Sequence, residues 1–225
     1  MATVTGVVDP HATHHHHTST GLDNRKIGLW AFIGSECMLF GSLIATYMIY
    51  KGRSVVGPMP HETWTNPQTG QVFPAILDIP VTSASTFVLL MSSLAMVLAH
   101  NAVVHRHKPK VTTGDRIIGN SSLWLGMTAL LGLVFLCFQA YEFTAFVREG
   151  LGFGTNLFGS SFFTLTGFHG AHVAVGVGWL TALLFIDRKR TLMPEDATNV
   201  DLCALYWHFV DVVWIVIFTL IYLIK

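Results

Sequence analysis

Five long apolar segments are the feature that most constrains how this chain can fold. They run from about residue 27 to 50, 81 to 104, 117 to 147, 158 to 186 and 202 to 224. A helix needs roughly 20 apolar residues to cross the hydrocarbon core of a bilayer, so each segment is long enough to span it. Helices are the expected form, because an open strand would leave backbone groups unpaired in lipid. The sequence therefore predicts an all-α integral membrane bundle of five transmembrane helices.

The composition agrees with a membrane protein. Only 12% of the 225 residues are charged and 52% are hydrophobic, whereas about 25% of the residues of a soluble domain are charged. The positive and negative charges balance, so no basic field favours nucleic acid and no nucleic-acid partner is expected. Cys37, Cys137 and Cys203 lie inside apolar segments without a C-x-x-C pair. We expect them to be small buried residues without a disulfide or metal role.

The ends and connections of the segments are polar. Residues 1–24 lack an apolar core of the kind that a cleavable signal needs, and they predict a flexible or disordered tail. Within this tail, His14–His17 fits such a segment better than a site for metal capture. The longest connection, Gly52–Pro80, contains five prolines and predicts an extended or turning surface loop. Residues 25–225 are expected to form one transmembrane domain.

The basic residues predict an orientation in the membrane. Nine lysines and arginines lie before the first segment, between the second and third, and between the fourth and fifth, whereas four lie on the alternate side. Because cytoplasmic loops carry the excess of lysine and arginine, the N-terminus is predicted to be cytoplasmic and the C-terminus outside.

Three carboxylates, Glu36, Glu142 and Asp211, fall inside apolar segments. Each needs a partner or a bound proton at that depth. Glu36 lies near the middle of the first segment, and His169 and His172 lie near the middle of the fourth. These residues lie at similar depths in the membrane, and each needs a polar partner there. We therefore predict a hydrogen bond between Glu36 and one of these histidines.

A second pair is expected in the last segment, where His208 and Asp211 are three residues apart on one helical face. These histidines and His100 also allow a different interpretation, as ligands of haem or copper. His169 and His172 are one turn apart on a single helix, so they cannot hold a haem from opposite faces. Buried hydrogen-bonded histidines, a lipid-headgroup site or a proton-linked site are the other interpretations. We expect no catalytic residue, bound metal or cofactor in this chain.

Four stretches resemble one known family, subunit III of the haem–copper terminal oxidases. LTGFHGAHVAVG (Leu165–Gly176) is similar to that family's TGFHGxHVxxG signature. YWHFVDVVWIVIFTLIY (Tyr206–Tyr222) resembles its closing helix. The first segment (Gly28–Tyr47) resembles the helix that carries its intramembrane glutamate, and QAYEF (Gln139–Phe143) matches its Q-x-x-E-[FY] element. The resemblance extends over nearly all of the chain from about residue 22 to 224.

This resemblance implies a cofactor-free accessory subunit of a proton-pumping oxidase that reduces O2 to water. Such a subunit packs against the catalytic subunit I, beside subunit II and other subunits, which carry the haem and copper. It binds phospholipid, supports proton uptake and protects the complex during turnover. The long form of the family has seven helices, so five helices resemble the short form of bacterial oxidases and imply the bacterial plasma membrane.

By the same resemblance, Glu36 takes the place of the family's intramembrane carboxylate. His169, His172, His208 and Asp211 fall on its motif positions. With Glu142 these residues are the candidates for a polar, proton-linked or lipid-contact role inside the membrane.

Other functions remain open at this point. Within the family, a quinol oxidase subunit and the subunit associated with nitric oxide reductases are alternatives. A different class is an independent membrane protein, either a proton-coupled transporter or a b-type cytochrome that uses the buried histidines. An accessory subunit is expected to be colourless alone and to need partners for activity, whereas an independent protein would transport or bind haem by itself.

Overall fold

The computed structural model of the chain describes residues 23–54, 56–106 and 112–224. The helices are α1 (Asn24–Tyr50), α2 (Ile79–Val104), α3 (Thr113–Ile118), α4 (Ser121–Arg148), α5 (Leu157–Arg190) and α6 (Ala197–Phe218). A 3-10 turn, η1 (Pro194–Asp196), precedes α6, and a π-helical turn, η2 (Thr219–Leu223), continues it. Within the described ranges five helical spans are long and apolar enough to cross a membrane, which confirms the predicted fold class. Most of the predicted tail, including His14–His17, lies outside the described residues.

The start of the third apolar segment differs from the prediction of one helix over residues 117–147. The short helix α3 ends before Gly119 and Asn120, and α4 begins anew at Ser121. Asn120 caps α4 by accepting a hydrogen bond from the Leu123 backbone N–H at 3.2 Å. Glycine is a poor helix former and asparagine is a favoured N-cap, so this pair ends one helix and starts the next.

The other predicted segments are correct to within a few residues, with two extensions. The fourth helix continues to Arg190, four residues beyond the predicted end. Its last turn holds Arg188, Lys189 and Arg190, whose positive charges interact favourably with a helix C-terminus. The last helix begins at Ala197 instead of about residue 202.

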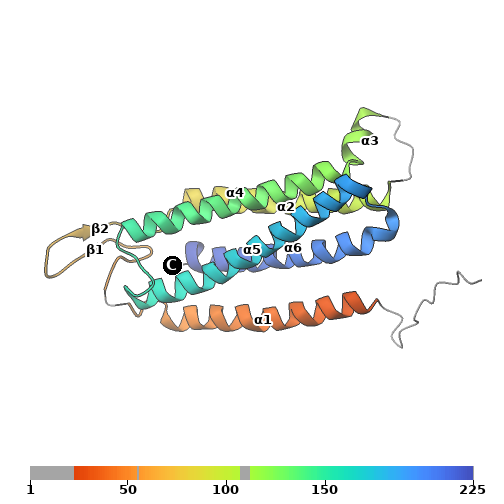
Figure 1. Cartoon of the computed structure of the whole chain (residues 1–225). Helices are drawn as coiled ribbons and strands as arrows, with labels where there is room; N and C mark the ends of the chain where they lie inside the picture. Colours follow the sequence, from red (N-terminus) through yellow and green to blue (C-terminus); the bar gives the residue numbers. More distant parts are fainter. Residues whose placement is uncertain (1–22, 55, 107–111, 225) are drawn as a thin grey trace, which may run out of the picture.

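The spans form an antiparallel bundle with one peripheral member. In Figure 1, α2, α4, α5 and α6 lie together, and α1 runs along one side of them. This first helix packs against α5 and α6. Its buried residues are Ile33, Phe40 and Tyr47, which are seven apart and define one narrow seam. Most of the α1 surface is therefore left for lipid or for another subunit.

Aromatic rings and glycines fill the centre of the bundle. Trp207 of α6 is buried between α4 and α5, where a Cβ at Gly132 would lie 2.5 Å from its ring and a Cβ at Gly176 would lie 2.7 Å from it. The Trp207 indole N–H donates to Ser92 Oγ at 2.9 Å, and Trp214 donates to Thr86 Oγ1 at 2.9 Å. Glycines and small hydroxyl residues thus allow the helices to approach closely, as is typical of membrane bundles.

The connection after α1 is irregular, as the prolines predicted. It contains one short antiparallel hairpin, β1 (Trp64–Thr65) paired with β2 (Val72–Phe73). Pro80 lies in the first turn of α2, where its missing N–H costs no helical hydrogen bond.

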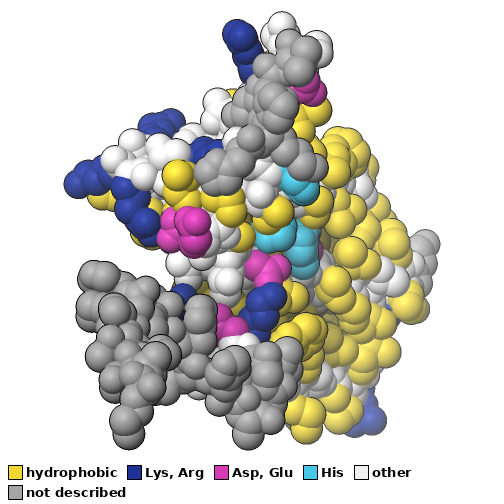
Figure 2. Space-filling view, turned by 90° about the vertical axis from the view of Figure 1, so that its right-hand side faces the viewer, with side chains coloured by type: hydrophobic (Ala, Val, Ile, Leu, Met, Phe, Trp, Pro, Cys, Tyr) yellow, Lys and Arg dark blue, Asp and Glu magenta, His cyan; other side chains and the backbone are white. Residues whose placement is uncertain are grey.

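The opposite end of the bundle is rich in charge. Figure 2 looks onto this end, where basic, acidic and histidine side chains gather while hydrophobic side chains cover the flank at the right. Lys26 of α1 forms an ion pair with Asp201 of α6, and Arg25 donates to Asn199 at 3.2 Å. These contacts fix the N-terminal end of α1 to the start of α6.

Candidate functional site

Glu36 and His172 form the central polar contact between α1 and α5. Glu36 Oε2 lies 3.1 Å from Nε2 of His172, and their side chains are 15% and 16% exposed. The other ring nitrogen, Nδ1, lies 2.8 Å from the carbonyl oxygen of Phe168 in the preceding turn. The ring also packs edge-on against Phe40 of α1, with 5.0 Å between centroids. The predicted hydrogen bond between Glu36 and a histidine of the fourth segment is confirmed, and His172 is the partner.

His169 contacts a different helix, α6. It is fully buried, and its Nε2 lies 3.2 Å from the carbonyl oxygen of Val210 on α6. The ring lies 4.7 Å from Trp214 and 5.8 Å from Phe135 between centroids. Three helical residues turn through about 300°, so the two histidines point 60° apart and meet different helices. Nδ1 of His169 is buried without a hydrogen-bond partner among the described residues.

Glu142 joins three elements near the C-terminal end of α4. Its Oε1 accepts hydrogen bonds from Thr82 Oγ1 at 2.6 Å and from the Tyr222 hydroxyl at 2.9 Å. All three side chains are buried. The need of Glu142 for partners was predicted, but Thr82 of α2 and Tyr222 of η2 were not. The sequence offers one signal for these two partners, which is that their hydroxyl groups lie at a similar depth in the membrane to Glu142.

The predicted pair of His208 and Asp211 is wrong. Nδ1 of His208 instead lies 2.8 Å from Ser93 Oγ on α2. Asp211 is 3% exposed, and neither of its carboxyl oxygens has a hydrogen-bond partner among the described residues. The reason is the packing of α2 on α6, which brings a hydroxyl within reach of the imidazole. A spacing of three residues places two side chains on one helical face, but their rotamers decide whether they form a hydrogen bond with each other.

A further polar cluster, which the sequence analysis missed, lies at the end of the bundle that carries α3. The buried carboxylate of Asp187 accepts hydrogen bonds from the hydroxyls of Ser121 and Ser122 and from the Leu192 N–H at 2.8 Å. Arg106 lies 3.4 Å from the same carboxylate and donates to the carbonyl oxygen of Leu192 at 2.9 Å. The cluster connects the ends of α2 and α5 to the start of α4. Asp187 directly precedes the basic run Arg188–Arg190, and nothing in this local pattern points to Ser121, Ser122 or Arg106 as its partners.

The cysteines differ partly from expectation. Cys203 is buried as predicted, but Cys37 and Cys137 are exposed on the surface of the chain. The apolar character of a segment does not separate its lipid-facing residues from its packed ones, because both faces are apolar in a membrane helix.

The histidines are poorly arranged to hold a metal or haem. Within the described ranges no group of three or more histidine, cysteine and acidic residues could hold a metal ion. Both ring nitrogens of His172 are engaged, and His169 is enclosed by aromatic rings. Nδ1 of His208 is engaged with Ser93 Oγ, and Nε2 makes no hydrogen bond to a described residue. The arrangement therefore fits hydrogen-bonded histidines better than a redox centre.

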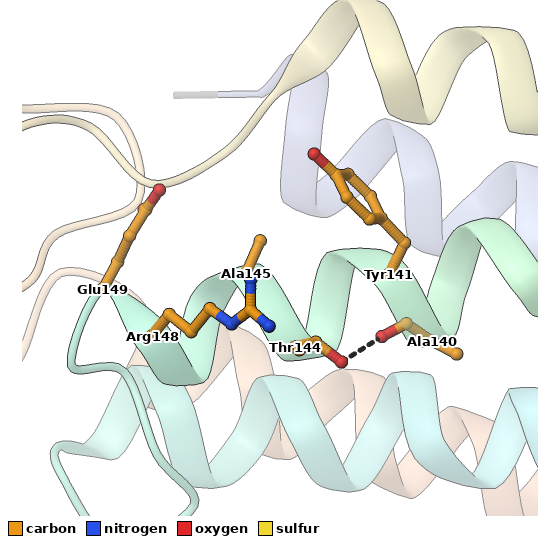
Figure 3. Close-up of a pocket in the computed structure, with 6 residues that line it drawn as sticks. All are labelled: Ala140, Tyr141, Thr144, Ala145, Arg148 and Glu149. Carbon is orange, nitrogen blue, oxygen red and sulfur yellow. Dashed lines mark hydrogen bonds between the residues drawn. The ribbon is translucent and has the colours of Figure 1, made fainter.

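The surface cavities are open hollows between or beside helices. One, of about 450 Å³, lies beside the C-terminal part of α4 (Figure 3) and is lined by Ala140, Tyr141, Thr144, Ala145, Arg148 and Glu149. Its Thr144 hydroxyl donates to the Ala140 carbonyl oxygen of the same helix at 2.8 Å. A second hollow, of about 220 Å³, lies between α1 and α5 and carries four hydroxyl groups besides that of Tyr50.

Comparison with known proteins assigns the family. The family model described as "Cytochrome c oxidase subunit III" matches residues 4–225. The "Cytochrome c oxidase subunit 3" of Bacillus sp. (strain PS3) is 38% identical over 200 residues, which cover 89% of this chain and 86% of the relative. The "Quinol oxidase subunit 3" of Bacillus subtilis (strain 168) is 36% identical, covering 88% and 85%. The "Cytochrome bo(3) ubiquinol oxidase subunit 3" of Pseudomonas aeruginosa is 34% identical, covering 95% and 90%. With a matching family model over nearly its whole length and such relatives, this chain belongs to the subunit III family of the haem–copper oxidases.

Proposed function

We propose that this chain is a non-catalytic accessory subunit of a bacterial haem–copper oxidase that reduces O2 to water. The observation that carries the proposal is the near-equal similarity to relatives named for different electron donors. Identity is 38% to a cytochrome c oxidase subunit and 36% to a quinol oxidase subunit. A subunit that handled the donor would be expected to differ between the two classes. Its role is therefore common to both, and the donor is bound by other subunits.

The internal bonding of the chain supports an accessory role. Glu142 and His169 bond to groups of the same bundle, and Glu36 bonds to His172. Polar groups engaged in this way hold helices together and are not presented to a substrate. In this proposal haem and copper reside in the partner subunits, and the chain packs against subunit I, beside subunit II.

The hollow between α1 and α5 supports phospholipid binding. Leu43 and Leu157 line it together with hydroxyl residues. The hydroxyls of Thr46, Ser161 and Thr164 donate to carbonyl oxygens of their own helices, so the hollow presents mostly carbon to its contents. Its apolar lining suits an acyl chain that runs along α1.

The partial exposure of the Glu36–His172 pair supports a part in proton uptake and turnover stability. The Glu36–His172 pair keeps some exposure, unlike Glu142 and Asp211. An ionisable pair at this depth is by default a candidate functional site. The nine basic residues on the same side as the N-terminus support a cytoplasmic location of that side. The bacterial relatives support a location in the bacterial plasma membrane.

The experiment is to purify the chain in mild detergent through a tag on it, record an optical spectrum and identify the proteins that come with it. We expect haem absorbance with a large multi-span partner. Removing this chain alone should leave the spectrum with the partner, and oxidase activity should start normally but decline faster during turnover.

Other outcomes would overturn the proposal. A chain that purifies alone and colourless would favour a proton-coupled transporter. A chain that purifies alone with haem would favour a b-type cytochrome. Co-purification with a complex that reduces nitric oxide but not O2 would favour the nitric-oxide-reductase-associated branch of the family.

A further inference from the structure

The short helix α3 carries an apolar face that the described part of the chain leaves uncovered. None of its six residues is buried. Ile117 is 51% exposed and Ile118 is 46% exposed. At about 100° per residue both isoleucines fall on one side of the helix, whereas Arg116 points about 160° away from Ile118. The helix is therefore amphipathic, with one apolar face and one basic face.

Several hydrogen bonds fix α3 to the start of the span α4. Only Gly119 and Asn120 separate the two helices. Trp124, in the first turn of α4, donates its indole N–H to the carbonyl oxygen of Ile117 at 3.0 Å. The Asn120 backbone N–H donates to the same oxygen at 3.2 Å. The orientation of α3 is thus set within the chain.

This orientation places α3 along the plane of the membrane. In Figure 1, α3 lies at the end of the bundle, runs across the direction of the spans and extends sideways beyond α4. Because α4 is a membrane span, a helix held across its first turn lies at the level where the apolar layer begins. Trp124 agrees with this level, since tryptophan is enriched at the interface between membrane and water.

The surroundings of α3 are basic. The sequence from residue 105 to 120 holds four lysines and arginines and one acidic residue. Arg116 itself is exposed and takes part in none of the ion pairs among the described residues. Basic side chains at a membrane surface are attracted to anionic lipids. An amphipathic helix with lysine or arginine on its polar face is typical of segments that lie in the interface.

We propose that α3 is a lipid-binding surface that lies in the headgroup layer beside the bundle. Ile117 and Ile118 reach the boundary of the acyl chains, and Arg116 contacts the phosphate groups of anionic phospholipids. This surface is separate from the hollow between α1 and α5. It does not rest on the accessory role proposed above, because it follows from the position of α3 at the end of a membrane span.

The test is spin-label accessibility in the intact complex, reconstituted into bilayers of phosphatidylethanolamine and phosphatidylglycerol. Ile118→Cys and Arg116→Cys are made separately in the chain whose three free cysteines are replaced by alanine, and each is labelled with a nitroxide. Oxygen concentrates in the apolar layer, whereas a charged or polar nickel chelate stays in water. The ratio of oxygen to nickel accessibility should be several-fold higher at residue 118 than at residue 116.

Two results would overturn the proposal. A water-like ratio at both positions would show that the isoleucines face water. A label at residue 118 that neither reagent reaches would show that another subunit covers them. The cysteine-free chain in the same complex gives the background from other subunits. The readout needs no oxidase turnover, so its failure would leave the accessory role untouched.

A second measurement tests the anionic headgroup. Ile118→Cys carrying a benzophenone should form phospholipid adducts on illumination, in which phosphatidylglycerol is enriched over its share of the bilayer. Arg116→Gln in the same chain should remove this enrichment, because it removes the charge. Mass spectrometry identifies the adducts. Adducts to protein, or lipid adducts that match the bilayer composition with Arg116 in place, would refute the proposal.

Discussion

At the scale of single residues, Glu36 and His172 show how depth along two helices predicts a contact. Both lie near the middle of their spans, and their hydrogen bond of 3.1 Å joins α1 to α5. The sequence could not decide between His169 and His172, because that choice depends on how α5 is rotated against α1. It also could not exclude the wrong pair of His208 and Asp211, since the competing Ser93 comes from another helix.

Glu36→Gln tests the Glu36–His172 contact. The amide removes the charge but keeps hydrogen-bonding capacity, so we expect normal assembly and normal initial oxidase activity, with a changed decline during sustained turnover. Oxygen consumption followed over many turnovers is the measurement. Ser35→Ala is the control, because the Ser35 hydroxyl bonds only its own helix, at the Phe32 carbonyl oxygen. Complete loss of initial activity in an assembled Gln variant would imply a direct catalytic part.

Gly176→Ala tests the close packing of α5 on α6. A Cβ at Gly176 would lie 2.7 Å from the Trp207 ring, whereas a Cβ at Gly178 would meet nothing within 4 Å. We expect Gly176→Ala to lower the free energy of unfolding by about 1–3 kcal/mol through overpacking. Gly178→Ala should be neutral or raise it by up to about 1 kcal/mol. Thermal unfolding of both variants in detergent is the measurement, and equal midpoints would show that the ring moves aside without cost.

At the scale of elements, apolar length predicted the five spans well, while their ends required local chemistry. The break between α3 and α4 depends on two residues, Gly119 and Asn120. The apolar pattern of residues 117–147 does not show such a short break, so a single helix was predicted there. The π-helical turn η2 has no sequence signal of this kind. Two side chains from the α1–α2 connection contact carbonyl oxygens of η2 and of the residue after it. Lys51 Nζ donates to the carbonyl oxygens of Leu220 and Ile224, and His61 Nε2 lies 3.1 Å from that of Ile221. Such long-range contacts are not visible in a local pattern.

The Asp187 cluster gives a prediction about how helix ends are joined. Asp187→Ala would leave the partly buried Arg106 without its carboxylate and would also leave the Leu192 N–H unpaired. Removing one partner of a buried pair costs about 3–5 kcal/mol. Asp196→Ala, which breaks a pair with the 60% exposed Arg190, should cost no more than about 1 kcal/mol. Thermal unfolding in detergent compares the two variants. A similar loss of stability in both would show that the Asp187 cluster does not stabilise the bundle more than an exposed ion pair does.

At the scale of the whole molecule, the balance of basic residues makes the orientation in the membrane testable. The hairpin residue Thr69 and the α5–α6 connection residue Met193 are both exposed and lie at opposite ends of the bundle. The prediction places Thr69 outside the cell and Met193 in the cytoplasm. The natural cysteines can be changed to alanine without loss of a disulfide, because all three are free.

Thr69→Cys and Met193→Cys in that cysteine-free background then report the two ends separately. A maleimide that cannot cross membranes should label Thr69→Cys in intact cells, and Met193→Cys only after the membrane is opened. This result would place the charged end of Figure 2, with the Asp187 cluster, on the cytoplasmic side, where protons are taken up from the cell interior. The reverse pattern would place Glu142 and the hairpin on the cytoplasmic side instead. It would refute the orientation while leaving the fold and the family unchanged, because neither depends on which side the chain begins.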